Sequence, residues 1–331
     1  MIRFGVIGTN RITEQFIHHA SDLDDFTLSA VYSRTEERAK EFAGKYNCQT
    51  TFTDLETMAG SDTIDAVYIA SPNSCHAEQA ILLMNHGKHV LCEKPIASNT
   101  AELDKMIRAA KKNHVVLMEA MKGTVLPSFQ SITDNLHKIG KIRRYFASYC
   151  QYSSRYDAYK EGTVLNAFNP SFSNGALMDI GIYCIYPMAV LFGEPSHVQA
   201  NALMLESGVD GEGSILLKYH DMDAIIMYSK ITDSYLPTEI QGENGNIIID
   251  KISAPNKVDI RYRDGSTEDM TQHQSNKTMA YEAAEFIKLI KTNQLESRIN
   301  SHHHSMITMK IMEEVREQTG LTFPADKMKK F

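Results

Sequence analysis

The sequence predicts an α/β fold that begins with a doubly wound parallel sheet. Over the first 120 residues, short continuous apolar runs alternate with helix-like stretches of roughly 10 to 13 residues. Continuous apolar strands joined by helices are typical of a parallel sheet buried on both faces. After about residue 121, several strand-like runs are separated by hairpin-like breaks, which favours an antiparallel or mixed sheet. We therefore expect two domains, residues 1–120 and 121–331.

The first domain follows from the alternation of apolar runs and helical stretches. Strands are predicted at residues 2–7, 27–32, 50–52, 66–70, 89–92 and 115–118, and helices at 11–21, 36–46, from 54 onward, 77–86 and 101–113.

The second domain is more irregular. A strand is predicted at 142–152, an irregular segment at 153–173 and a helix at 176–192, stopped by Gly193 and Pro195. Several strands follow between 198 and 270, and helices at 278–291 and 305–319 close the chain. A structureless segment as long as 153–173 is usually functional, so we expect it to close over a substrate with Arg155, Tyr156, Asn166 and Phe168.

Composition excludes several function classes. The chain is 43% apolar and 23% charged, and its net charge of −7 comes without a long Lys or Arg run, so no nucleic-acid surface is expected. Neither a signal peptide nor a long uninterrupted apolar span is evident, which predicts a cytoplasmic protein that binds no membrane. Five cysteines without a CxxC pair fit a reducing compartment. The side chains of the three consecutive histidines at 302–304 would point in different directions on a helix, so no metal site is expected.

A strand that ends in charged residues marks the first candidate site. The apolar run at 89–92 leads directly into Glu93, Lys94 and Pro95. Pro95 stops the strand and restricts Lys94 to an extended backbone. Open α/β sheets bind their ligands at the carboxyl ends of strands, so we expect Lys94 in a binding site. An exposed Glu-Lys turn is the alternative.

The turn after the first strand is the candidate phosphate loop. Gly8 stands where the dinucleotide fingerprint GxGxxG begins, but Asn10 and Thr13 occupy the other two glycine positions. Asparagine tolerates a left-handed backbone better than other non-glycine residues, so we expect Asn10 to adopt one there. The backbone from Gly8 through Thr9, Asn10, Arg11 and Ile12 would then face an anion at the helix start. A plain strand-turn-helix is the alternative.

The end of the second strand predicts which dinucleotide binds. NAD sites usually carry an acidic residue there, whereas this strand ends in Ser33 and Arg34, with Arg38 in the next helix. A hydroxyl and guanidinium groups suit a 2′-phosphate, which favours NADP over NAD. Alternatively, Arg34 and Arg38 only solvate a helix face.

A second constellation lies in the segment SNGALMDIGIYCIYP at 173–187. Asp179 and Tyr183 are four residues apart, which places them on one face of a helix. A tyrosine beside an ammonium can move a hydroxyl proton, so Lys94, Tyr183 and Asp179 form a coherent set for hydride transfer at a carbinol carbon. A purely structural Tyr–Asp hydrogen bond is the alternative.

Taken together, these segments resemble the glucose–fructose oxidoreductase / inositol dehydrogenase (Gfo/Idh/MocA) family of NAD(P)-dependent oxidoreductases. The resemblance covers nearly the whole chain and rests on the Gly8 loop and on the segments IASPNSCH (69–76), HVLCEKPIA (89–97), MEA (118–120), GALMDIGIYCI (175–185) and IQGENGNIIID (240–250). It implies an N-terminal Rossmann domain and a C-terminal α/β domain with a large open, mainly antiparallel sheet. It also implies a homodimer, or a dimer of dimers, formed through the outer face of that sheet.

The resemblance also implies roles for individual residues. Lys94 belongs to the active site, and Glu93 and Pro95 shape the nicotinamide pocket. The turn Ala70, Ser71, Pro72 and Asn73, followed by His76, lines the cofactor. Tyr183 stands where many members carry a histidine, which is similar to the dihydrodiol and xylose dehydrogenase branch, whose members favour NADP.

The sequence therefore predicts an NADP-dependent oxidoreductase that acts on a sugar, polyol or cyclic diol. Lys94 and Tyr183 would handle the proton, and Asp179 would bind the small-molecule substrate together with Tyr156, Asn166 and Phe168. Two alternatives remain open: a non-catalytic NAD(P)-binding regulator and an NAD-dependent dehydrogenase.

Overall fold

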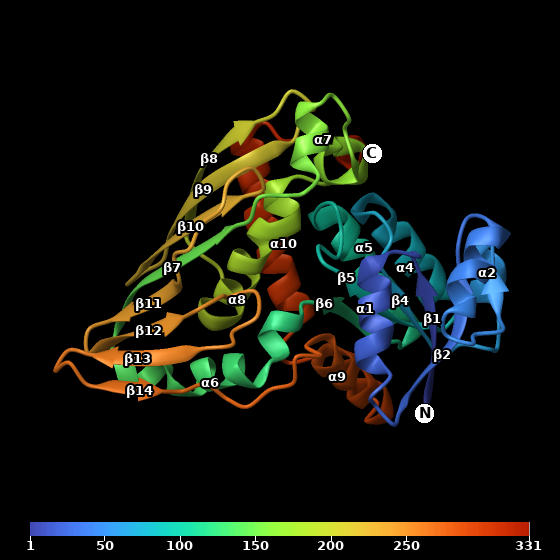
Figure 1. The fold of residues 1–331 in the computed structure, drawn as a ribbon, viewed down its shortest axis with the longest axis horizontal. Helices are drawn as coiled ribbons and strands as arrows, with labels where there is room; N and C mark the ends of the chain where they lie inside the picture. Colours follow the sequence, from blue (N-terminus) through green and yellow to red (C-terminus); the bar gives the residue numbers. More distant parts are fainter. Residues whose placement is uncertain (331) are drawn as a thin grey trace. The chain divides into compact units, whose positions relative to one another are not determined.

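The computed structural model describes residues 1–330, and they form two compact units (Figure 1). The first comprises Met1–Ala120 and Lys277–His302, and the second comprises Met121–Asn276 and the chain from His303 onward. The sequence suggested one division after residue 120. The segment Lys277–His302 instead returns to the first unit, because it carries a helix whose apolar residues belong to that unit's core.

A six-stranded parallel sheet forms the centre of the first unit, as predicted. Its order is β3-β2-β1-β4-β5-β6, and every pairing in it is parallel. The strands are β1 (Ile2–Ile7), β2 (Phe26–Tyr32), β3 (Thr51–Phe52), β4 (Ala66–Ile69), β5 (His89–Glu93) and β6 (Leu117–Ala120). The strand order reverses at β1 and β4, and ligands of open α/β sheets bind beside such a switch point.

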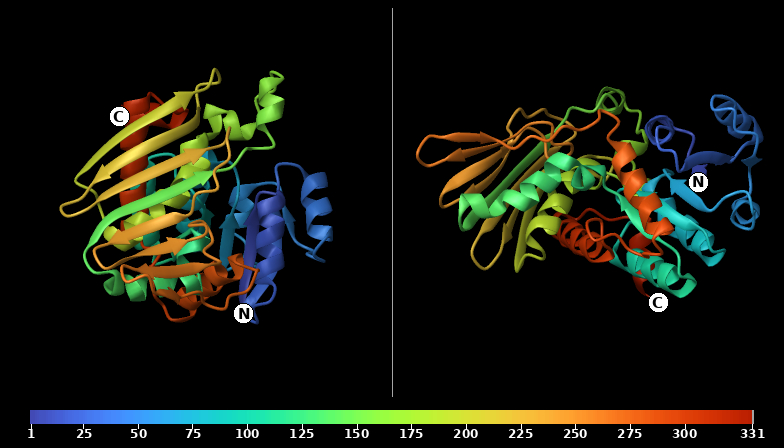
Figure 2. Two further views of the ribbon diagram at one scale, coloured as in Figure 1. Left: turned by 60° about the vertical axis from the view of Figure 1, so that its left-hand side comes forward. Right: turned by 90° about the horizontal axis from the view of Figure 1, so that it is seen from below.

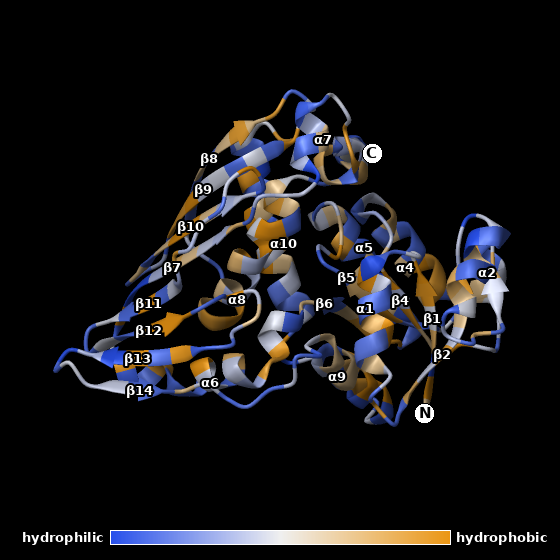
Figure 3. Ribbon diagram, viewed as in Figure 1, coloured by the Kyte–Doolittle hydropathy of each residue, from blue (hydrophilic) through white to orange (hydrophobic). Residues whose placement is uncertain are grey.

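Helices cover this sheet, and their apolar residues build the core of the first unit. They are α1 (Arg11–Ala20), α2 (Glu36–Gly44), α3 (Leu55–Ala59), α4 (His76–Asn85), α5 (Thr100–Asn113) and α9 (Met279–Lys291). Phe16 of α1 and Phe286 of α9 both pack against Phe4 of β1. The strands β1 and β4 are correspondingly hydrophobic in Figure 3.

An eight-stranded sheet dominates the second unit. Its order is β14-β13-β12-β11-β7-β10-β9-β8, and it is antiparallel except for the parallel pair β7–β10, as predicted for a mainly antiparallel sheet. The strands are β7 (Ile142–Cys150), β8 (His197–Met204), β9 (Asp210–Lys218), β10 (Asp223–Ser229), β11 (Thr238–Gly242), β12 (Gly245–Ile249), β13 (Val258–Tyr262) and β14 (Thr267–Asp269).

Among the residues that the structure describes, helices cover one face of this second sheet and leave the other uncovered. The views in Figures 1 and 2 agree that α6 (Pro127–Asn135), α8 (Ile182–Phe192) and α10 (His302–Thr319) lie on the same side of it. Their apolar residues pack with the inward-facing strand residues, such as Ile226 and Ile240. The short helix α7 (Tyr156–Lys160) lies in the irregular segment after β7.

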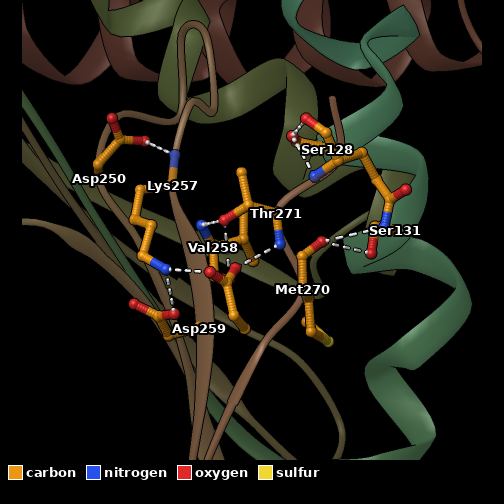
Figure 4. A network of polar contacts seen from close by, with 10 residues as sticks. Ser128, Ser131, Asp250, Lys257, Val258, Asp259, Met270 and Thr271 are labelled. Carbon is orange, nitrogen blue, oxygen red and sulfur yellow. Dashed lines mark hydrogen bonds and ion pairs between the residues drawn. The ribbon is translucent and has the colours of Figure 1, made fainter. Parts of the chain in front are cut away.

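Helix α6 was not predicted from the sequence. It begins at Pro127 after Leu126, which provides no side-chain cap, so the usual polar start signal is missing. Hydrogen bonds to a distant strand segment hold the helix instead: the Ser131 hydroxyl donates to the Met270 carbonyl at 2.9 Å (Figure 4). In the same network, Lys257 contacts the carboxylates of Asp259 and Asp269 on the exposed surface.

One described segment, Pro170–Phe192, is long and apolar enough to cross a membrane by length and composition alone. Within the second unit, however, 72% of its most apolar window is buried against other elements. Such burial is the pattern of a core helix in a soluble protein.

Candidate active site

The loop after β1 lies against the end of β4 at the switch point of the first sheet. Gly8 has a backbone φ of +100°, and a Cβ at this position would lie 2.4 Å from the Ala70 carbonyl oxygen. Only glycine therefore fits this turn without a backbone shift. A tight turn of this kind is the role of the first glycine in a dinucleotide loop.

Asn10 does not take the left-handed conformation that we expected. Its φ is −124°, and the positive φ in this loop belongs to Gly8. Asn10 is instead the N-cap of α1, because its side-chain oxygen accepts hydrogen bonds from the N–H groups of Ile12 and Thr13 at 3.0 and 3.1 Å. Its amide nitrogen donates to the Ala70 carbonyl at 2.7 Å. Asn10, which stands in place of the second glycine, thus links the loop to the residue that follows β4.

One of the residues expected at the 2′ end of the cofactor, Arg38, contacts this loop. Arg38 donates to the Thr9 carbonyl from Nη2 at 2.8 Å and to the Thr9 hydroxyl from Nε at 3.2 Å. Arg34 is exposed, and Ser33 is half-buried at the end of β2. Arg38 therefore braces the loop, whereas Arg34 is available to a ligand from solvent.

His76 joins the two turns that were expected to line the cofactor. The turn after β4 runs through Ser71 and Pro72 into a 3₁₀ turn at Asn73–Cys75. The fully buried imidazole of His76 contacts the carbonyl oxygens of Ser71 and Pro95 at 3.0 and 2.9 Å. Burial lowers the pKa of His76. A neutral imidazole has one N–H and donates to only one of these two carbonyls.

The Glu-Lys-Pro turn after β5 is not an exposed surface turn. Glu93 and Pro95 are buried, and Lys94 is half-buried. The Glu93 carboxylate accepts a hydrogen bond of 2.5 Å from the hydroxyl of Tyr68, and another of 3.2 Å from the Lys94 N–H. The Tyr68 ring is stacked on Phe16 with 3.8 Å between centroids. The turn that carries Lys94 is therefore fixed from the core of the sheet.

In the second unit, Asp179 lies in a π-helical turn that precedes α8. This turn spans Leu177–Gly181, and the N–H of Ile182 donates to the Leu177 carbonyl across the wider π spacing. Such turns are frequent at functional sites. Tyr183 follows in the first turn of α8, where its ring packs edge-on against Tyr149 with 5.7 Å between centroids.

Two charged residues that the sequence analysis missed hold this turn. The ammonium of Lys230 contacts the Asp179 carboxylate, and the Lys230 side chain is almost completely buried. Asp210 accepts a hydrogen bond of 2.7 Å from the N–H of Leu177, at the start of the turn. Burial raises the pKa of Asp210 to about 6.

The segment after β7 forms an aromatic cluster. The rings of Tyr156 and Tyr159 stack on each other and both contact Phe168. Phe168 is fully buried beneath them, whereas Asn166 is exposed and Tyr156 is half-buried. The segment is therefore packed by its own side chains, and Phe168 acts as the centre of that packing.

The residues that the structure describes form no metal centre, since no three of their His, Cys, Asp and Glu side chains are grouped so that they could hold a metal ion. In the first unit, the His302 ring contacts the Leu117 carbonyl at 2.9 Å.

A signal for Lys230 exists in the sequence but was not used. The strand β10 ends at Ser229 and leads directly into Lys230, which is the same pattern that drew attention to Lys94. Asp210 and Tyr68 had no comparable signal, because their importance comes from partners far along the chain.

Two family models and several known proteins match this chain. A model described as the oxidoreductase family with an NAD-binding Rossmann fold (Gfo/Idh/MocA) matches residues 2–121, and a model of the Gfo/Idh/MocA C-terminal domain matches residues 136–248. The chain is 60% identical to scyllo-inositol 2-dehydrogenase (NADP(+)) IolU of Bacillus subtilis strain 168, over 98% of this chain and 99% of that protein.

A more distant relative and a solved structure also match over nearly the whole chain. The trans-1,2-dihydrobenzene-1,2-diol dehydrogenase of Xenopus laevis is 32% identical, over 97% of this chain and 99% of that protein. A 3-ketoreductase from Actinomadura kijaniata, solved with NADP and TDP-benzene, has a TM-score of 0.83 at 22% identity, over 96% of this chain and 98% of that chain. At this identity, the solved structure supports the fold alone.

Proposed function

The chain belongs to the Gfo/Idh/MocA family of oxidoreductases, and from this premise we propose that it is an NADP-dependent dehydrogenase of a sugar, polyol or cyclic diol. The observation that carries the proposal is the 60% identity, over almost the full length of both chains, to a protein named as an NADP(+)-dependent scyllo-inositol dehydrogenase. A cyclic polyol is therefore the first substrate class to test.

The residues of the first unit fit a dinucleotide with a 2′-phosphate. The Gly8 turn has the tight geometry that a dinucleotide loop requires at its first glycine. Arg34, exposed beside the half-buried Ser33, supplies a guanidinium for the 2′-phosphate, and Arg38 holds the loop through Thr9. When bound, the nicotinamide supplies or accepts the hydride.

We propose that Lys94 and Tyr183 handle the proton of the reacting hydroxyl. Lys94 is fixed at the end of β5 by the buried Glu93, and its ammonium can donate to a substrate oxygen. Tyr183 supplies a phenol that can exchange the proton, and an ammonium nearby favours the phenolate that a base requires. Asp179 accepts a hydrogen bond from another substrate hydroxyl.

Two measurements test this proposal. Fluorescence titrations with NADPH and NADH are expected to give clearly tighter binding of NADPH, since paired charge-assisted hydrogen bonds to a 2′-phosphate contribute on the order of 2 kcal/mol. Lys94→Met is expected to abolish turnover of cyclitols while leaving the dissociation constant of NADPH nearly unchanged. Normal turnover by this variant would contradict the role of Lys94, and equal binding of NADH would favour the NAD-dependent alternative.

We also propose that the uncovered face of the eight-stranded sheet forms a dimer interface. Phe146, Ile225 and Leu216 are neighbours across β7, β10 and β9 on this face. Leu216 is 47% exposed, and Met227 and Leu203 are also exposed on the same sheet. An apolar patch rimmed by polar residues is typical of a protein–protein contact.

A further inference from the structure

Tyr68 is a buried tyrosine of the parallel sheet whose hydroxyl has no part in the proposed reaction. It lies in β4, and its side chain is fully buried. Its hydroxyl donates to the Oε1 atom of Glu93, the last residue of β5, at 2.5 Å. A phenylalanine would fill the same space without a polar group that must find a partner in the core. Packing alone therefore does not explain why this position carries a hydroxyl.

The Glu93 carboxylate connects the Tyr68 hydroxyl to the backbone of Lys94. Its Oε1 atom accepts from Tyr68, and its Oε2 atom accepts from the N–H of Lys94 at 3.2 Å. The two oxygens of a carboxylate are held in one plane, so a hydrogen bond to one oxygen also fixes the direction of the other. Glu93 is buried, whereas Lys94 is half-buried. The orientation of the peptide at Lys94 therefore depends on Tyr68 through Glu93.

The later residues of the same turn are held by different groups. The Pro95 carbonyl contacts the Nδ1 atom of His76 at 2.9 Å, and the N–H of Ile96 donates to Oε1 of Glu119 at 3.0 Å. His76 and Glu119 are both buried. Neither contact involves Tyr68. Removal of the Tyr68 hydroxyl should therefore loosen the start of the turn and leave its end in place.

The Tyr68 ring is itself held by the helix that begins at the candidate phosphate loop. It stacks on Phe16 of α1 with 3.8 Å between the ring centroids and 7° between the ring planes. Phe16 is fully buried, and α1 starts directly after its cap, Asn10. The ring therefore has little freedom, and its hydroxyl has a defined position relative to α1.

We propose that Tyr68 is a positioning residue for Lys94, which acts by orienting the Glu93 carboxylate that accepts the Lys94 N–H. This inference rests on the proposed function, in which the Lys94 ammonium donates to the reacting oxygen of the substrate. A proton donor that is displaced from its alignment slows the chemical step. The contacts that bind the dinucleotide phosphates lie on other residues, so cofactor binding is retained.

The test removes only the hydroxyl. Tyr68→Phe keeps the ring that stacks on Phe16, and the full chain is assayed for turnover of scyllo-inositol with NADP and for binding of NADPH by fluorescence titration. We expect kcat to fall roughly tenfold, because small displacements of a catalytic group are costly, while the dissociation constant of NADPH stays nearly unchanged.

A matched control separates positioning from the general loss of a buried hydrogen bond. Tyr219 of the second unit is also buried, and its hydroxyl donates to the Gly193 carbonyl at 3.0 Å. Tyr219→Phe makes the same chemical change away from the candidate site residues. It should lower stability in urea unfolding by an amount similar to that of Tyr68→Phe, and it should keep the kcat of the wild type.

A double-mutant cycle tests whether Tyr68 acts through Glu93. Glu93→Ala removes the acceptor of both the Tyr68 hydroxyl and the Lys94 N–H, so it should lower kcat at least as much as Tyr68→Phe does. In the Glu93→Ala background, Tyr68→Phe should cause no further loss of kcat. If Tyr68→Phe does not fold, Glu93→Ala is the decisive variant, and a wild-type kcat in it overturns the inference.

The inference is also overturned if Tyr68→Phe keeps the kcat of the wild type, or if it weakens NADPH binding as much as it slows turnover, since a general loosening of the first unit would do the latter. Losses that multiply in the double variant overturn it as well. Normal turnover by Lys94→Met contradicts the proposed role of Lys94, and the inference falls with it. An inactive Lys94→Met beside a fully active Tyr68→Phe refutes the inference alone.

Discussion

At the scale of single residues, the cofactor loop separates two arginines that look alike in sequence. Arg38 is bound to both the carbonyl and the hydroxyl of Thr9, so it stabilises the loop whatever ligand is present. Arg34 is exposed at the end of β2 and is the residue that a 2′-phosphate can engage from solvent. Identical side chains therefore have different expected effects on cofactor choice.

Alanine substitutions distinguish these two roles. Arg34→Ala should weaken NADPH binding roughly tenfold and leave NADH binding almost unchanged, because it removes a charge-assisted contact to a group that NADH lacks. Arg38→Ala should weaken both cofactors, because it loosens the loop. Fluorescence titrations with each cofactor measure both effects. A loss restricted to NADPH in Arg38→Ala would mean that Arg38 binds the phosphate itself.

At the scale of elements, the π-helical turn that carries Asp179 depends on one buried carboxylate. Asp210 accepts from the Leu177 N–H at the start of this turn, and burial is the main reason why its pKa rises to about 6 from the ordinary 3.8. Lys230 partly opposes this rise. Ionisation of the buried Asp210 carboxyl therefore lowers the free energy of unfolding, and this effect depends on pH.

The sign of this pH dependence follows from the raised pKa. A carboxyl whose pKa is higher in the folded state stabilises the fold fully at low pH, and this contribution is lost as the pH rises through about 6. The loss is on the order of 3 kcal/mol. Asp210→Asn keeps an oxygen for the Leu177 N–H and removes the titration. The stability of the wild type relative to this variant should therefore be higher at pH 4.5 than at pH 7.5.

Urea unfolding of both proteins at the two pH values measures this difference. An equal difference in stability at both pH values would show that Asp210 does not titrate in this range. A larger advantage for the wild type at pH 7.5 would show that its pKa is lowered instead.

At the scale of the whole molecule, the described part of the chain leaves one face of the second sheet without helices. In Figures 1 and 2, α6, α8 and α10 lie on its other side. The alternation of burial along β9, where Leu217 is buried and Leu216 is exposed, gives the uncovered face an apolar centre. Polar residues such as Gln199 and Ser214 surround it.

A charge on this face should dissociate the proposed dimer. Leu216→Glu would place a carboxylate in an apolar contact, where it cannot be hydrated or paired. We expect light scattering after size exclusion to give the mass of a dimer for the wild type and of a monomer for the variant. Leu295→Glu, at an exposed leucine of the first unit, is the control and should remain dimeric. A monomeric wild type would refute the interface.

The sequence alone predicted the elements whose signals lie within short stretches of the chain. Apolar runs and helical periodicity gave the parallel sheet of the first unit because burial imposes those periods locally. A strand that ends in charged residues made Lys94 a predicted site residue, and the residues after β2 predicted NADP, which the comparison with IolU supports. Helix α6 was missed because its start lacks a polar cap and its partners lie more than 100 residues away.

Only the tertiary structure decided which distant groups meet. Asn10 was expected to take the backbone conformation of a glycine, but it caps α1, and its amide nitrogen donates to the Ala70 carbonyl, 60 residues away. Asp179 was expected to serve Tyr183 or the substrate, and the structure adds Lys230, 51 residues further along the chain. The segment Lys277–His302 likewise returns to the first unit, because its helix packs with core residues from distant parts of the chain. Pairing at such separations depends on strand order and register, which no local pattern of residues records.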